Sequence, residues 1–232
     1  MIERRAAHER GHVQLDWLNS HHSFSFGHYH DPAHMGWSAL RVINDDTVQP
    51  GKGFGTHGHR DMEILSYVLE GALEHRDSMG SGSVLKPGNV QLMSAGTGVQ
   101  HSEFNPSASD PVHFLQIWLL PNRQSVAPSY QERHIQEGEK RGQLKLLASG
   151  NPDDDALFLH QDARIYATLL NGDEHIDYDP PAGRQIYLHV ARGSIRVNEH
   201  EIKAGDGLKI KDEPALLLAH GHEAEVLLFE LP

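Results

Sequence analysis

Apolar and polar residues alternate along many short segments of this chain, and stretches with the helical period of 3.6 residues are scarce. Successive side chains of a strand point to opposite faces, so alternation is typical of a strand with one buried face. The 22 glycines and 12 prolines supply turns between such segments. The pattern predicts an all-β protein, with strands at 39–43, 63–69, 90–93, 113–120, 185–190, 194–197, 215–218 and 225–230.

The two halves of the chain share a weak internal repeat. Val68-Leu-Glu-Gly71 and Val190-Ala-Arg-Gly193 each end an apolar strand at a glycine. A Lys-x-Gly follows both at a similar distance, at 86–88 and 203–205. A unit of short strands and glycine turns that occurs twice favours two β-sandwiches or barrels in tandem.

A polar, charged segment from Pro121 to about Gly142 separates the two repeats. We therefore expect a first domain at 1–123, a linker at 124–142 and a second domain at 143–232. Within the linker, residues 130–137 are predicted to form a short helical turn.

Composition narrows the classes of partner. The formal charge is -12 with neutral histidines, and an acidic surface repels phosphate groups, which argues against direct binding of nucleic acid or an anionic membrane. The chain has no cysteine, which excludes disulfides and zinc–thiolate sites. It shows neither the apolar core of a signal peptide nor the run of about 20 apolar residues that spans a bilayer. We expect a cytoplasmic protein.

Two pairs of the form ligand-x-ligand are the main candidates for chemistry: His57-Gly-His59 and His101-Ser-Glu103. Alternate residues of a strand share one face, so two such pairs on facing strands can converge on a point. Three imidazoles and one carboxylate suit a divalent transition metal and leave coordination positions open. Because imidazolium cannot bind a metal, affinity is expected to fall as the pH drops through about 6.5.

Other histidine pairs are weaker candidates. His28 and His30 lie among turn residues, and no second pair has a matching spacing. His220 and His222 lie in a polar break between two apolar segments. His75 and Asp77 share a strand face, where they either bond a ligand or substrate or form an exposed polar face. Phe54, Met93, Gln116 and Trp118 either line a pocket or pack in the core.

The spacing of glycines around the two ligand pairs resembles the cupin motifs. Gly51-x5-His57-x-His59-x3-Glu63-x7-Gly71 has one residue more than the first motif before its last glycine. Gly88-x7-Gly96-x4-His101-x3-Asn105 resembles the second motif, with Ser94 in place of its proline and two extra residues before the histidine.

The amino-acid sequences of residues 53–63, 67–71 and 93–103, together with these departures from the general cupin motifs, resemble those of the pirin family. The resemblance implies a bicupin fold of two antiparallel β-barrels, with a metal in the N-terminal barrel and none in the C-terminal one. It implies His57, His59, His101 and Glu103 as the metal ligands. In cupins generally the ligand would be Glu63; in pirins that role passes to the glutamate two residues after the last histidine, here Glu103.

The same resemblance implies a quercetin 2,3-dioxygenase type of activity. The protein would open the heterocyclic ring of a flavonol such as quercetin with O2, and Glu103 would also act as the catalytic base. One divalent transition metal is expected, Fe(II) in first place, with Zn, Mn, Co or Ni as alternatives. The partners would be a small flavonol-like aromatic substrate and O2.

Two other functions remain open at this stage. One is a metal-containing regulatory or protein-binding module that acts through a protein partner and has no flavonol substrate. The other is a sugar isomerase or epimerase, because cupin barrels host many activities and a fold does not fix a function.

Overall fold

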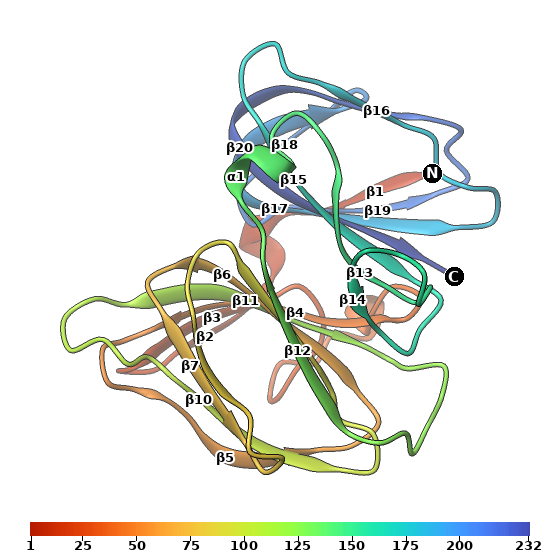
Figure 1. Cartoon of the computed structure of the whole chain (residues 1–232). Coiled ribbons are helices and arrows are strands. Elements are labelled where there is room, and N and C mark those ends of the chain that lie inside the picture. The colour runs from red at the N-terminus through yellow and green to blue at the C-terminus, as the bar shows by residue number, and fades with distance from the viewer. The chain divides into compact units, whose positions relative to one another are not determined.

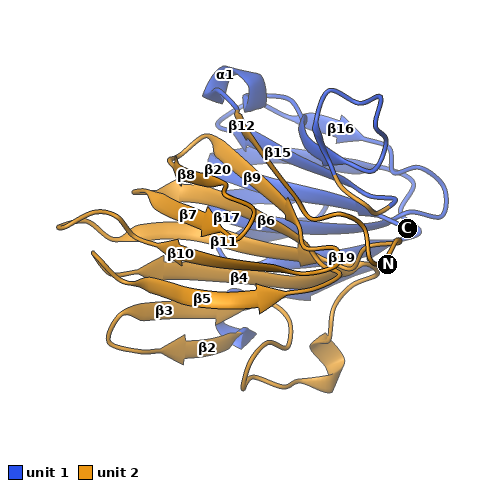
Figure 2. Cartoon of the chain, turned by 60° about the horizontal axis from the view of Figure 1, so that its bottom comes forward, with its two compact units in different colours: residues 1–10, 135–158, 162–232 blue, residues 11–134, 159–161 orange.

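A computed structural model describes residues 1–232, which form two compact units, each built almost entirely of strands (Figures 1 and 2). Unit 1 contains residues 1–10, 135–158 and 162–232, and unit 2 contains residues 11–134 and 159–161. No helix of the chain has the length and hydrophobicity needed to cross a bilayer.

Unit 2 consists of a seven-stranded sheet, ordered β12-β9-β6-β11-β4-β3-β2, and a four-stranded sheet, ordered β5-β10-β7-β8. Its neighbouring strands pair antiparallel. Its elements are β2 (Gly11–Gln14), β3 (Leu18–His22), the 3-10 helix η2 (Pro32–His34), β4 (Leu40–Val48), β5 (Gly53–His59), β6 (Glu63–Glu70), β7 (Leu73–Asp77), β8 (Gly82–Leu85), β9 (Asn89–Ser94), β10 (Val99–Phe104), β11 (Val112–Leu119) and β12 (Ser129–His134).

The central strands of the seven-stranded sheet carry the core of unit 2. Seven of the eight residues of β6 are buried, so this strand is covered on both faces. One face of β6 and β11 presents polar side chains, Ser66 and Gln116, that bond to Glu103 of the four-stranded sheet. The interior between the two sheets therefore holds a polar centre within an apolar frame.

Unit 1 is a single nine-stranded sheet around one apolar cluster, with the path β1-β19-β17-β20-β15-β13-β14, to which β16 and β18 add on β20 and β17. Its elements are β1 (Ile2–Arg5), the 3-10 helix η1 (Ala7–Glu9), α1 (Glu137–Lys140), β13 (Lys145–Ser149), β14 (Leu157–Phe158), β15 (Arg164–Leu170), β16 (Ile176–Tyr178), β17 (Gln185–Val197), β18 (His200–Lys203), β19 (Gly207–Lys211) and β20 (Leu216–Leu231).

Two long strands of unit 1 replace pairs of shorter predicted ones. Residues 215–218 and 225–230 both fall within or beside β20, so the polar break predicted around His220 is wrong. His220 has φ 54° inside this strand, and the pairing of β17 with β20 shifts register at three places. Such bulges bend a strand without ending it.

The internal repeat is visible in the backbone. Gly71 has φ 73° and Gly193 has φ 66°, and the later Gly88 and Gly205 have φ 91° and 84°. Only glycine adopts such left-handed conformations without strain. Both halves of the chain therefore use glycine for equivalent turns of their strands.

The segment between the repeats contains a strand where a helical turn was expected. Residues 129–134 form β12, an edge strand that pairs with β9, and the short helix α1 begins only at Glu137. Edge strands tolerate polar and charged residues, so the polarity of Ser129–His134 did not exclude a strand. At the other end of the chain, residues 1–10 belong to unit 1, where β1 pairs with β19.

Candidate metal centre

The two predicted ligand pairs lie on neighbouring strands of the four-stranded sheet of unit 2. Strand β5 carries His57 and His59, and β10 carries His101 and Glu103. The strands are antiparallel, with His101 directly opposite His57, and their register shifts between His101 and Glu103. A shift of this kind re-aims the following side chain, which here is Glu103.

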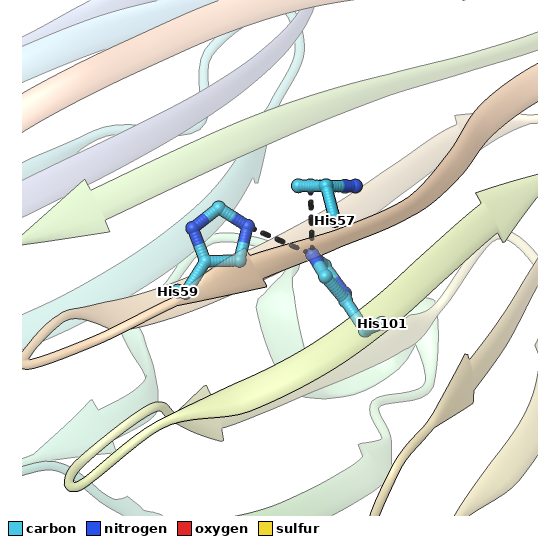
Figure 3. Close-up of side chains that lie close together, drawn as sticks. All are labelled: His57, His59 and His101. Atoms are coloured by element: carbon cyan, nitrogen blue, oxygen red, sulfur yellow. Dashed lines mark hydrogen bonds between the residues drawn. The ribbon is translucent and has the colours of Figure 1, made fainter.

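Three imidazole rings converge in front of this pair of strands (Figure 3). The Nε2 atom of His101 lies 2.9 Å from Nε2 of His59 and 3.2 Å from Nε2 of His57. Nδ1 of His57 lies 2.8 Å from the carbonyl oxygen of Gly55. A carbonyl only accepts, so Nδ1 carries the proton and Nε2 is left with a lone pair.

The surroundings keep two of these rings neutral. Burial, followed by the charge of His57, lowers the pKa of His59 to about 4. Burial, followed by the charges of His57, His59 and His75, lowers the pKa of His101 to about 3. Neutral imidazole is the form that binds a metal. Three converging nitrogens with a carboxyl nearby therefore fit a divalent transition metal.

Glu103 lies beside this trio rather than within it. One of its carboxyl oxygens is within 4.8 Å of ring nitrogens of His101 and His75. Its side chain is buried, accepts a hydrogen bond of 2.7 Å from Nε2 of Gln116, and lies 3.1 Å from Oγ of Ser66. Burial raises the pKa of Glu103 to about 7, although the bonds from Ser66 and Gln116 oppose the shift.

His75 and Asp77 on β7 bond to each other, with Nε2 of His75 at 3.1 Å from the Asp77 carboxylate. Both side chains are fully buried, so an exposed polar face is the wrong interpretation of this pair. Tyr130 of β12 stacks on the His75 ring, with centroids 4.9 Å apart. Burial lowers the pKa of His75, although Asp77 opposes the shift.

Glu63, the ligand position of cupins in general, has other partners. Its carboxylate accepts hydrogen bonds from Oγ of Ser94 at 2.8 Å and from the backbone N–H of His160 at 3.2 Å. Nδ1 of His160 lies 3.3 Å from the second oxygen. Glu63 therefore holds residues 159–161 on unit 2.

The other histidine pairs named from the sequence lie outside the metal centre, whereas Trp118 contacts it. Neither His28 and His30, in a turn, nor His220 and His222 belong to a group of converging ligands. Trp118 packs edge-on against His59, with centroids 4.9 Å apart.

Phe54 contacts Trp17, and Met93 is a core residue. Sequence reasoning did not single out Ser66, Gln91 or His160. Ser66 and Gln91 can be recognised in the sequence as single polar residues within apolar strands. Nothing in the sequence around His160 indicates its contact with Glu63.

Two family models match this chain. Residues 3–119 match the family model for pirin, and residues 146–231 match that for the quercetinase C-terminal cupin domain. The chain belongs to the pirin family. Its fold is accordingly the all-β bicupin.

Relatives cover this pirin from end to end. The quercetin 2,3-dioxygenase of Escherichia coli strain K12 is 45% identical over 232 residues, which are 100% of this chain and 99% of that protein. The crystal structure of YhhW from Escherichia coli has a TM-score of 0.95 at 45% identity and covers 100% of this chain and 98% of that one. The bacterial pirin YhhW from Escherichia coli in complex with nickel(II) has a TM-score of 0.95 at 44% identity, with 100% and 99% covered.

Proposed function

We propose that this pirin is a metal-dependent dioxygenase that opens the heterocyclic ring of a flavonol with O2. The observation that carries the proposal is the convergence of three imidazole nitrogens beside a buried carboxyl group. Relatives named quercetin 2,3-dioxygenase, and a relative that binds nickel(II), support it.

His57, His59 and His101 would hold the metal through their Nε2 atoms, and Glu103 would complete the set with one carboxylate oxygen. When bound, the metal would supply a Lewis acid that acidifies a flavonol hydroxyl. A mixed nitrogen and oxygen donor set suits Fe(II), and it also accommodates Mn, Co, Ni or Zn. We propose Fe(II) as the native ion.

Glu103 would also act as the base. Its carboxylate would take the proton of the flavonol 3-hydroxyl, and the electron pair of the broken O–H bond would stay on the flavonol oxygen. With a metal bound, Glu103 would stay in its unprotonated form, which is the form that accepts a proton. The overall reaction consumes one O2, opens the ring and releases carbon monoxide.

The test is turnover of quercetin by metal-loaded protein, with and without O2. The proposal predicts loss of the flavonol absorbance in air, with one carbon monoxide formed per flavonol, and no loss under nitrogen. His101→Ala, loaded in the same way, serves as the control and is expected to be inactive. Equal loss in air and under nitrogen, or no loss in either, would refute the dioxygenase and favour a metal-containing regulatory module.

A further inference from the structure

Three polar side chains form a row across the apolar centre of the seven-stranded sheet in unit 2. Ser66 on β6 is directly opposite Gln116 on β11 and Gln91 on β9. Ser66 and Gln91 are fully buried, and Gln116 is 7% exposed. Burying polar groups is unfavourable unless they are hydrogen-bonded, so the bonds they form indicate what the row does.

The row bonds Glu103 through both of its oxygens. Nε2 of Gln116 donates to Oε2 at 2.7 Å, and Oγ of Ser66 lies 3.1 Å from Oε1. Two donors on two oxygens fix the plane of the carboxyl group as well as its position. Each oxygen has a second lone pair, which stays free for a metal or for a substrate proton.

The Ser66 hydroxyl completes a closed ring of three side chains. Its oxygen lies 2.7 Å from Oε1 of Gln116 and 3.1 Å from Oε1 of Glu103, and it also accepts from Nε2 of Gln91 at 3.3 Å. A hydroxyl has a single hydrogen, so Ser66 donates to only one of the two oxygens at a time.

We propose that Ser66 and Gln116 are positioning residues that hold the Glu103 carboxyl group in one orientation, both as a carboxylate and after it has taken a proton. As a carboxylate, Glu103 receives the Ser66 hydrogen. When the O–H bond of the substrate breaks, its proton binds the free lone pair of a Glu103 oxygen, and the contacts of the carboxyl group with Ser66 and Gln116 stay in place. The carboxyl group need not rotate between the two states.

The claim that the orientation is kept after Glu103 takes a proton rests on the proposed function. The claim that Ser66 and Gln116 orient the carboxylate as a ligand does not. Orientation of a ligand can be measured by metal affinity alone, because groups that bond a ligand typically contribute about 10–100-fold in affinity. The acceptance of the substrate proton appears only in turnover. The two parts can therefore fail separately.

The variants are Ser66→Ala and Gln116→Leu, which remove the two donors. Ser66→Thr keeps the hydroxyl and is the rescue variant. Ser94→Ala is the matched control, because Ser94 is an equally buried serine that bonds another buried glutamate, Glu63, at 2.8 Å. If Gln116→Leu does not fold, Gln116→Asn, which keeps the amide but shortens its reach, takes its place.

Calorimetry with nickel(II) on the full chain is the first measurement. Ser66→Ala and Gln116→Leu are expected to bind about 10-fold more weakly or worse, while Ser66→Thr and Ser94→Ala stay within about twofold of the parent protein. At saturating metal, the two donor variants should lose kcat for quercetin with little change in KM.

Wild-type nickel(II) affinity in both donor variants would overturn the positioning role. An equal loss in Ser94→Ala would also overturn it, since a general effect on stability would then explain the result. If the parent protein does not turn over quercetin, the proposed function fails and the affinities still decide whether Ser66 and Gln116 orient Glu103. If the affinities fall but kcat at saturating metal does not, the role in proton acceptance is refuted.

Discussion

Removal of the Glu103 carboxyl should change the number of protons released when the metal binds. Burial raises the pKa of this group to about 7, so at pH 6 about 90% of the metal-free protein carries a proton there. A carboxyl must lose its proton to act as a ligand. Metal binding through Glu103 therefore releases about 0.9 proton at pH 6 and about 0.1 at pH 8.

The other ligands do not obscure this signal. The pKa values of His59 and His101 are lowered to about 4 and 3, so both rings are already neutral at pH 6. Any contribution from His57 is common to the parent protein and to Glu103→Gln and cancels in their difference. The fall in affinity that the sequence suggested below about pH 6.5 is therefore assigned to Glu103 rather than to His59 or His101.

The assay is calorimetric titration with nickel(II) at pH 6 and pH 8, in buffers of different ionisation enthalpy, which gives the proton count directly. The difference between parent protein and Glu103→Gln should be about 0.9 proton at pH 6 and nearly zero at pH 8. Affinity of the parent protein should rise about tenfold from pH 5 to pH 6, as expected for the release of one proton. Equal proton counts in the two proteins at pH 6 would refute Glu103 as a ligand.

Three further predictions concern stability and metal content. His57→Ala should lose most of its bound metal, as measured by elemental analysis, and unchanged metal content would contradict this. Nickel(II) at 100 times its Kd should stabilise the parent protein by about 2.7 kcal/mol, and the variant should lack this stabilisation. Burial, only partly offset by a bond from Ser20, raises the pKa of Asp46 to about 7, so its native form prefers the proton and its stability contribution falls as the pH rises from about 4 to 7. Asp46→Asn should therefore raise the free energy of urea unfolding at pH 8 by up to about 4 kcal/mol, with little change at pH 4, and a variant less stable at pH 8 would oppose this. Glu63→Met, which removes both acceptor oxygens, should cost about 1–3 kcal/mol and speed hydrogen exchange at the amide of His160, which would stay slow if Glu63 did not hold that segment.

The pattern of apolar and polar residues placed six of the 20 strands, which are β4, β6, β9, β11, β17 and β20. It failed where one strand runs through a bulge. The left-handed conformation of His220 depends on pairing with a strand far away in the sequence, so a polar segment was mistaken for a break between strands. The same limit applies to β1, whose partner β19 lies near the other end of the chain.

The ligand candidates were recoverable because His57, His59 and His101 follow the period of a strand. Their surroundings were predictable only in part: Gln116 was a candidate for a pocket, but its bonds to Ser66 and Glu103 were not foreseen. Ser66, Gln91 and Gln116 come from three strands, and only their register makes them neighbours. The contact of Glu63 with His160 joins residues 97 positions apart, and nothing in the local sequence of either residue indicates it.

The composition of the metal centre is tested most directly by a crystal structure of the nickel(II)-loaded protein, with the ion located by anomalous scattering. We predict one ion, bound at about 2 Å by Nε2 of His57, His59 and His101 and by one oxygen of Glu103, while Ser66 and Gln116 each stay bonded to a different oxygen of that carboxylate. No ion is expected in unit 1. An ion bound by His75 in place of Glu103, or one with no carboxylate ligand, would contradict the account.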